Sequence, residues 1–331
     1  MGFVYLLCED AVEGELARAE LWALTGAEAA EGDRAAFASV ACDVTRAAYV
    51  STCAEVLAET NSLDDLVDAV RDLRIEGHQF RIEVRREGPE TSEPAQAHAP
   101  SPEVAGRLAE VLDGYPNLGA PRERFLALAG YGAWRFCRVL SRSRRDHVGH
   151  VKRPRNFSNA LPVRYARAMV NLVAAPGDTV VDPCCGMGTC LIEAASIGAR
   201  AAGFDLSKPT IWAARANLAH FGLDVPVQVA DARELEGEWD AAVLDLPYGH
   251  TVRIDDDLHA RVLANLAPRV RRLAVVTGAP SEEVFAQVGM TVLRCARVPK
   301  STLVRHFYAL TGLLDAGPRL TATTAKGGVC L

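Results

Sequence analysis

The stretch of sequence that decides the fold is VVDPCCGMGTCLIEAA, residues 180–195. An apolar run ends in Asp182 and breaks into a turn that contains Gly186 and Gly188, and an apolar-periodic segment restarts at Thr189. This pattern predicts a β-strand, a tight loop and the first turn of an α-helix. In that arrangement the backbone N–H groups at the helix start can face a bound nucleotide or carboxylate.

A second informative stretch is AAVLDLPYGH, residues 241–250. It predicts a buried strand over 241–244 that ends in Asp245, followed by Leu246, Pro247 and Tyr248. An acid, a rigid turn and an aromatic ring would then stand together at the exit of the strand. Such a corner is suited to holding a planar base for chemistry.

Strands and helices alternate through the C-terminal half of the chain. Strands are expected at 179–182, 201–204, 227–229, 241–244, 273–276, 291–298 and 302–310, with helices at 162–173, 189–197, 209–220, 258–267 and 282–288. This alternation predicts an α/β fold with a parallel, doubly wound sheet. The last two strands are too close in sequence for a crossover helix, so they are expected to pair antiparallel.

The N-terminal half predicts a mixture of strands and helices. Strands are expected at 3–8, 36–44, 80–84, 125–128 and 133–140, and helices at 12–24, 45–57, from Ser62 onward and at 103–112. Residues 88–102 contain four prolines and few apolar residues, which indicates a loop or a flexible insertion.

Composition indicates a globular cytoplasmic protein: of 331 residues, 49% are hydrophobic and 24% charged. The start of the chain lacks the basic region of a signal peptide, and no stretch approaches about 18 uncharged apolar residues, so no membrane partner is expected. The nine cysteines have no CxxC spacing, which favours reduced thiols and no bound metal.

Basic residues are concentrated between residues 135 and 167, which contain ten Lys or Arg and one acidic residue, although the whole chain carries a net charge of −6. Two interpretations stay open for this stretch. It is either an ordinary solvated face or a stripe that follows phosphate groups.

The glycine-rich turn could serve NAD, FAD or S-adenosylmethionine. A dinucleotide motif would need a third glycine where Leu191 stands. Asp182 precedes the turn, where an acid can meet the ammonium of a methionine group. Asp205 ends the second expected strand, where it can accept both ribose hydroxyls, and Asp231 follows the third, where it can accept from an adenine amino group. Three acids at the ends of successive strands are better explained as ligands of S-adenosylmethionine than as N-caps of the helices that follow.

The corner at Asp245 points to methyl transfer onto an exocyclic amine. The lone pair of such an amine is delocalised into its ring, so hydrogen-bond acceptors on both N–H groups are needed to free it. The Asp245 carboxylate and the Leu246 carbonyl are expected to be these acceptors. Pro247 would fix the turn and Tyr248 would stack on the base.

Four segments together resemble the THUMP-associated class I RNA guanine-N2 methyltransferases, which act on tRNA. They are DPCCGMGTCLIEAA, DLPYG, the preceding RPRNFSNALPVRYARAMVNLV and the closing VPKSTLVRHFYAL, and they span residues 153–310. The resemblance implies a Rossmann-like class I methyltransferase domain over 151–313 with an antiparallel terminal hairpin. Looser resemblance implies a ferredoxin-like domain over 1–65 and a divergent THUMP-like RNA-binding region over 66–150, with a flexible tail over 314–331.

The resemblance implies S-adenosylmethionine as cofactor and the N2 amine of a guanosine in tRNA as methyl acceptor. The implied cofactor contacts are Asp182, Pro183, Cys184, Gly186, Gly188, Thr189, Asp205, Leu206, Asp231 and Ala232, with Leu161 and Pro162 from the preceding segment. Three alternatives stay open. In the first, the same chemistry acts on ribosomal RNA, DNA or a protein glutamine amide. In the second, the chain binds S-adenosylmethionine and RNA without catalysis, and in the third it is a nicotinamide oxidoreductase.

Overall fold

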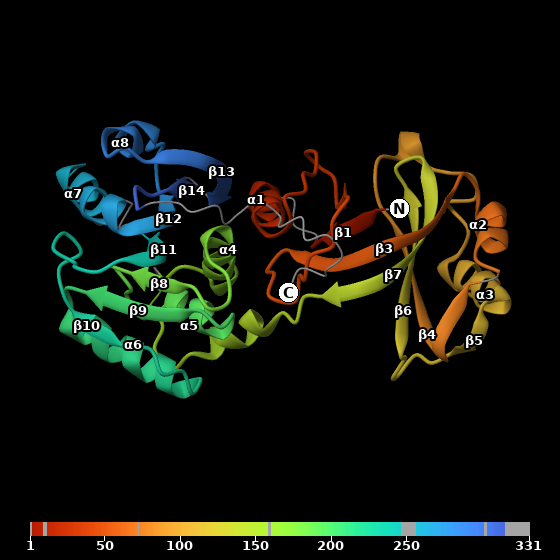
Figure 1. Cartoon of the computed structure of the whole chain (residues 1–331), viewed down its shortest axis with the longest axis horizontal. Coiled ribbons are helices and arrows are strands. Elements are labelled where there is room, and N and C mark those ends of the chain that lie inside the picture. Colours follow the sequence, from red (N-terminus) through yellow and green to blue (C-terminus); the bar gives the residue numbers. More distant parts are fainter. Residues whose placement is uncertain are drawn as a thin grey trace.

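The computed structural model describes residues 2–8, 12–71, 73–157, 160–245, 256–300 and 303–314. Within these residues the strands form two seven-stranded sheets, one in each half of the chain (Figure 1). We call residues 2–142 the N-terminal module and residues 160–314 the C-terminal domain. A linker that contains the 3-10 helix η2 (Asp146–Lys152) joins them. Among the described residues, no helix is both long and apolar enough to cross a bilayer.

The N-terminal module is built on a sheet with strand order β2-β1-β3-β7-β6-β4-β5. The strands are β1 (Phe3–Leu7), β2 (Ala35–Ala38), β3 (Val50–Thr60), β4 (Arg74–Arg86), β5 (Asp113–Pro116), β6 (Glu123–Gly130) and β7 (Ala133–Arg142). The helices are α1 (Gly14–Thr25), α2 (Leu63–Ala69) and α3 (Ser101–Val111), with the 3-10 turn η1 (Glu90–Ser92). All seven strands of the module belong to this one sheet. The division of the module into a ferredoxin-like and a THUMP-like region stays a prediction.

The helix predicted over residues 45–57 is wrong, because this segment leads into the central strand β3. Its neighbours Cys53 and Ala54 point to opposite faces of the sheet, and both are fully buried in separate apolar clusters. A strand buried on both faces loses the period-two alternation of polar and apolar residues by which strands are recognised. The alanine-rich sequence was therefore mistaken for a helix.

Residues 88–100 of the proline-rich segment form a loop, including the turn η1, that is packed onto the sheet, and residues 101 and 102 begin α3. The Trp134 indole N–H donates to the Ala95 carbonyl at 2.9 Å, and Arg86 Nε donates to the Ala97 carbonyl at 2.6 Å. Ala97 itself is buried. Of the two alternatives for this segment, the loop therefore applies.

The C-terminal domain is built on a sheet with strand order β10-β9-β8-β11-β12-β14-β13. The strands are β8 (Thr179–Asp182), β9 (Arg200–Asp205), β10 (Val227–Val229), β11 (Trp239–Asp245), β12 (Val270–Thr277), β13 (Thr291–Lys300) and β14 (Leu303–Thr311). The pairs from β10 to β12 are parallel, and β14 is antiparallel to both β12 and β13. The predicted doubly wound sheet with an antiparallel terminal hairpin is confirmed.

Helices cover both faces of this second sheet. They are α4 (Val163–Val173), α5 (Thr189–Ser196), α6 (Lys208–His220), α7 (Asp256–Leu266) and α8 (Glu282–Gln287), with the 3-10 turn η3 (Ala267–Arg269). Buried residues of α4, α5 and α6 share one apolar cluster, and those of α7 and α8 share another. The neighbours Val180 and Val181 of β8 point into these two clusters, so the central strand is buried on both faces.

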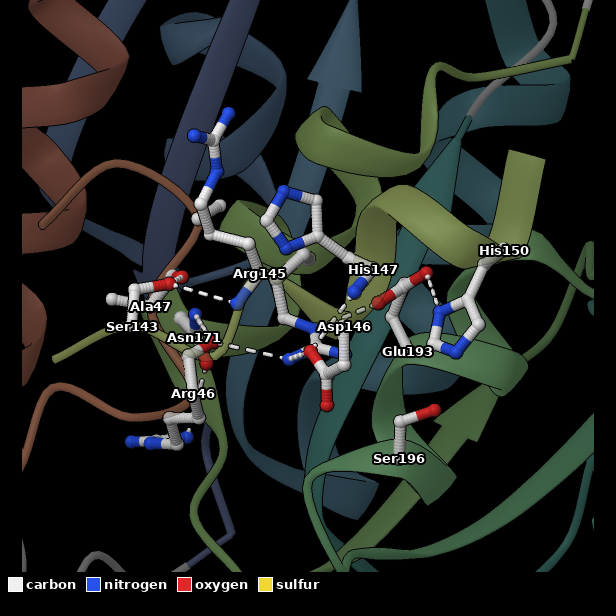
Figure 2. A network of polar contacts seen from close by, with 12 residues as sticks. Arg46, Ala47, Ser143, Arg145, Asp146, His147, His150, Asn171, Glu193 and Ser196 are labelled. Carbon is white, nitrogen blue, oxygen red and sulfur yellow. Dashed lines mark hydrogen bonds and ion pairs between the residues drawn. The ribbon is translucent and has the colours of Figure 1, made fainter. Parts of the chain in front are cut away.

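A buried polar network joins the two halves (Figure 2). Glu193 of α5 accepts a hydrogen bond from Arg167 Nε at 2.7 Å, and its other oxygen lies 2.7 Å from Nδ1 of His150 in the linker. Arg167 Nη1 donates to the Arg46 carbonyl of the N-terminal module at 3.1 Å and lies 3.0 Å from Asp146. Apolar side chains of α1 and α4 share a core beside this network.

Most of the basic residues of the stretch 135–167 fall into two groups in the structure, those paired with acids and those exposed to solvent. Five of the arginines form ion pairs with acids, namely Arg135 with Glu59, Arg138 with Glu123, Arg142 with Glu83, Arg164 with Glu13 and Arg167 with Glu193. Arg144, Arg145, Lys152 and Arg155 are exposed. The stretch is therefore neither one solvated face nor one continuous stripe.

His147 gives the junction a pH dependence. Burial lowers the pKa of His147 to about 4, while the unfolded chain binds that proton at an ordinary value near 6.5. The unfolded state therefore holds more protons in this range, and the free energy of unfolding is expected to fall as pH falls from about 6.5 to about 4. We expect this slope to be shallower in His147→Gln and unchanged in the control His220→Gln, which alters an exposed histidine. Urea denaturation across pH measures the slope, and equal slopes in all three proteins would contradict the prediction.

Candidate active site

The register of three parallel strands brings the predicted acids to one edge of the sheet. β8 lies between β9 and β11, with Val181 opposite Ala202 on one side and Ala242 on the other. Asp182 ends β8, Asp205 ends β9 and Asp245 ends β11. Because the strands run in the same direction, all three residues lie at the carboxyl edge of the sheet.

The glycine loop after β8 is tied to the end of β9. Gly186 and Gly188 have φ values of +51° and +80°, in the left-handed region that suits glycine, and Gly188 is the N-cap of α5. Asp205 Oδ2 accepts a hydrogen bond from the Gly186 N–H at 3.0 Å, and the Cys185 N–H donates to the Phe204 carbonyl at 2.8 Å. The loop is thus held at the edge where the acids gather.

Asp182 is the most buried of these acids. It is 3% exposed, and its Oδ1 accepts a hydrogen bond from the Cys184 N–H at 3.2 Å. Burial, together with the charges of Asp245 and Asp205, raises the pKa of Asp182 well above its ordinary value. A cationic group placed beside Asp182 would relieve this cost, so the edge is suited to a positively charged ligand.

Cys184 lies within the field of all four predicted acids. Burial, followed by the charges of Asp182, Asp205, Asp245 and Asp231, raises the pKa of its thiol to about 12. The thiol therefore stays protonated at neutral pH and is a poor nucleophile. The charge of Asp231 therefore also acts at this part of the sheet edge.

Asp231 has a partner in its own loop. Its Oδ1 accepts a hydrogen bond from the Arg233 backbone N–H at 2.9 Å, and Arg233 Nε lies 2.9 Å from the same oxygen. These bonds lower the pKa of Asp231 to about 2. The carboxylate is charged but already accepts hydrogen bonds from Arg233, so an adenine amino group would share it with that residue.

The other predicted contacts occupy varied places. Pro183 and Thr189 are buried in the loop and at the start of α5, and Leu206 is 64% exposed just beyond Asp205. Ala232 is buried, and its carbonyl accepts a hydrogen bond from Asn265 Nδ2 at 3.0 Å. Their cofactor contacts stay predictions.

Five predicted residues need separate mention. Leu161 is 3% exposed and belongs to the core, and Pro162 precedes the first turn of α4. Leu246, Pro247 and Tyr248 lie outside the described residues.

Asn217 of α6 is a structural residue of the site that sequence inspection missed. It is fully buried, and its Nδ2 donates to the Met187 carbonyl in the glycine loop at 3.0 Å. Its amide also brackets the backbone of Arg155, accepting from the N–H at 2.8 Å and donating to the carbonyl at 2.9 Å. The available signal was a polar residue on the apolar face of an amphipathic helix, since Ala213, Ala214 and Leu218 are its buried neighbours.

The fold and the acidic edge define a class I methyltransferase domain. Residues 151–296 match the UPF0020 family, described as an RMKL-like methyltransferase domain. The predicted methyltransferase character of the C-terminal half is therefore confirmed.

Two curated relatives are tRNA (guanine(10)-N2)-dimethyltransferases. The protein of Pyrococcus abyssi is 33% identical over 174 residues, which is 48% of this chain and 52% of the relative. That of Methanothermobacter thermautotrophicus is 38% identical over 115 residues, which is 34% of each chain. This chain thus spans about half or less of the curated relatives it matches. Among solved structures, TrmN from Thermus thermophilus is 21% identical with a TM-score of 0.49, over 95% of this chain and 100% of that one.

Gly203 of β9 offers a test of how tightly the loop is packed. A Cβ at this position would lie 2.4 Å from Leu191 Cδ1 and 3.1 Å from Cys185 Cβ. We expect Gly203→Ala to lower the free energy of unfolding by about 1–3 kcal/mol through overpacking. Gly106→Ala in α3, where nothing lies within 4 Å of the added Cβ, is the control and should raise it by about 0.5–1 kcal/mol. Urea denaturation measures both, and a Gly203→Ala protein as stable as wild type would show that the loop is loosely held.

Proposed function

We propose that this chain is an S-adenosylmethionine-dependent methyltransferase that modifies the N2 amine of a guanosine in tRNA, in the cytoplasm. The observation that carries the proposal is the meeting of Asp182, Asp205 and Asp245 around the glycine loop at one sheet edge. The buried Asp182, with its raised pKa, favours a ligand with a cationic amino group. Leu191 stands where a dinucleotide motif has its third glycine, so the three acids around this loop fit a nucleoside cofactor better than a dinucleotide.

The residues of the edge have distinct proposed roles toward the cofactor. Asp182 would hold the ammonium of the methionine group, Asp205 the ribose hydroxyls and Asp231 the adenine amino group. The loop residues Pro183, Cys184, Gly186, Gly188 and Thr189 would enclose the methionine part, with Leu206 and Ala232 beside the adenosine and Leu161 and Pro162 closing the pocket. When bound, the cofactor supplies a methyl group activated on a sulfonium.

The strand that ends in Asp245 would present the acceptor base. The Asp245 carboxylate accepts a hydrogen bond from one amine N–H and the Leu246 carbonyl accepts from the other, which localises the nitrogen lone pair. Pro247 would hold the turn and Tyr248 would stack on the base. Since β11 pairs directly with β8, the amine and the methionine end of the cofactor would face each other, and this positioning supplies most of the rate enhancement.

Two observations favour tRNA as the substrate. The curated relatives that this chain matches are named tRNA (guanine(10)-N2)-dimethyltransferases. The chain also carries an N-terminal module of about 140 residues that is joined to the catalytic domain through a buried core, as expected of a module that presents a large substrate.

Asp245→Asn tests the catalytic proposal. The substitution keeps the shape of the side chain but replaces the charged carboxylate by a neutral amide, whose oxygen is a weaker acceptor for the amine N–H. Transfer of labelled methyl groups to unmodified tRNA should therefore fall about 100-fold or more. Glu283→Gln on α8 is the matched control, because it removes a carboxylate with no proposed role, and it should keep full activity. Methyl transfer by Asp245→Asn at the wild-type rate, or faster methylation of DNA, ribosomal RNA or protein than of tRNA, would contradict the proposal.

The raised pKa of Asp182 predicts a pH dependence of cofactor affinity. The free protein holds a proton on Asp182 up to a pH well above the ordinary range, and a cationic ligand binds the ionised form. Affinity for S-adenosylmethionine should therefore increase as pH rises above the ordinary range of an aspartate, up to the range where the ligand's own amino group loses its proton.

Isothermal titration calorimetry checks this directly, since binding should also release protons into the buffer. Asp182→Asn should bind more weakly and lose the pH dependence. A wild-type affinity that is flat or falls with rising pH over the same range would contradict the assignment of Asp182 to the ammonium.

A further inference from the structure

Exposed aromatic side chains stand on and beside helix α6. Trp212 of α6 is 61% exposed, and Phe157, in the linker segment that Asn217 fastens to α6, is 63% exposed. The contact of such an exposed tryptophan ring with water is unfavourable, and exposed aromatic residues are common on binding surfaces.

Arg155 lies over the Trp212 ring, with its guanidinium carbon 4.8 Å from the ring centroid. The Asn217 side chain bonds both the N–H and the carbonyl of Arg155, so the backbone that carries this arginine is fixed. The pair is therefore prearranged, with a cation on one side of the ring and more than half of the tryptophan surface still open to solvent.

The surroundings of the pair are basic. Lys208, Trp212 and Arg215 are spaced i, i+4 and i+7 on the exposed face of α6, and that helix contains no Asp or Glu. The sequence from residue 147 to residue 177, which includes Lys152 and Arg155, also contains no acid. This is a local excess of positive charge on a protein whose net charge is −6.

We propose that Arg155 and Trp212 form a docking site for an unpaired nucleotide of the RNA substrate. A base would stack on the open part of the Trp212 ring, and its phosphates would lie against Arg155, Lys208 and Lys152. Asn217 bonds Arg155 on one side and the Met187 carbonyl of the glycine loop on the other, so this site adjoins the cofactor edge. The proposal rests on the proposed function, which it deepens by naming where the substrate is gripped.

Binding of an unmodified tRNA transcript to the full chain tests the site. Trp212→Ala should weaken binding by about 5- to 150-fold, the range that corresponds to the loss of one base–aromatic stack. Trp212→Phe should keep most of the affinity, because phenylalanine still stacks. Arg155→Gln should reduce the dependence of affinity on salt by about 0.7 in the log–log slope, as for one phosphate contact on a single strand. Leu293→Ala, an exposed apolar residue of β13, is the control and should bind tRNA as wild type does.

Tryptophan fluorescence is a second measurement, which reports on stacking at Trp212 alone. Trp134 is fully buried, and Trp212 is the most exposed tryptophan among the described residues. Bound tRNA should protect the wild-type protein from acrylamide quenching, and Trp212→Phe should lose that protection while it still binds. All variants should bind S-adenosylmethionine with wild-type affinity, which shows that they are folded.

The outcomes separate the two proposals. If Trp212→Ala binds and methylates tRNA as wild type does, the docking site is wrong and the proposed function stands. If wild-type protein binds tRNA through Trp212 but transfers no methyl group, the docking site stands and the proposed function is wrong. If Trp212 instead drives self-association in sedimentation experiments and its removal leaves tRNA affinity unchanged, the surface is a contact between copies of the chain, and the docking site is overturned.

Discussion

The parallel pairing of β8 with β9 and β11 is the constraint on which the site depends. It places the ends of three strands at one edge, so carboxylates far apart in the sequence meet around a single glycine loop. Their mutual repulsion and the burial of Asp182 are unfavourable for the protein alone, as its raised pKa records. The hydrogen bond from the Gly186 N–H to Asp205 offsets part of this cost and fixes the loop to the neighbouring strand. A site in which a buried carboxyl group is costly to ionise is prepared for a cation.

The same helix serves the site and the junction between the two halves. α5 begins at Thr189, directly after the glycine loop, and carries Glu193 one turn later. Glu193 is fully buried and meets both Arg167 of α4 and His150 of the linker (Figure 2). Because a buried charge that loses its partner is strongly destabilising, a change at the junction would also be felt at the loop. The junction and the glycine loop are thus held by the same helix.

Much of the C-terminal domain was predictable from the sequence, because its rules are local. The acids after three apolar runs, the glycines at positive φ and the short connection before the last strand each have one simple structural consequence. The failures arose where distant residues decide the outcome. β3 was mistaken for a helix because separate apolar clusters bury it on both faces of the sheet. The basic stretch looked continuous because Glu59, Glu83 and Glu123 are remote in sequence from the arginines they pair with. Asn217 was missed because its partners lie 30 and 62 residues away.

A crystal structure of the full chain with S-adenosylhomocysteine tests the central claim most directly. The account predicts the amino group of the ligand beside Asp182, its ribose at Asp205 and its sulfur on the side of the loop that faces Asp245. A ligand bound at any other part of the molecule, or one whose sulfur points away from the end of β11, would contradict it.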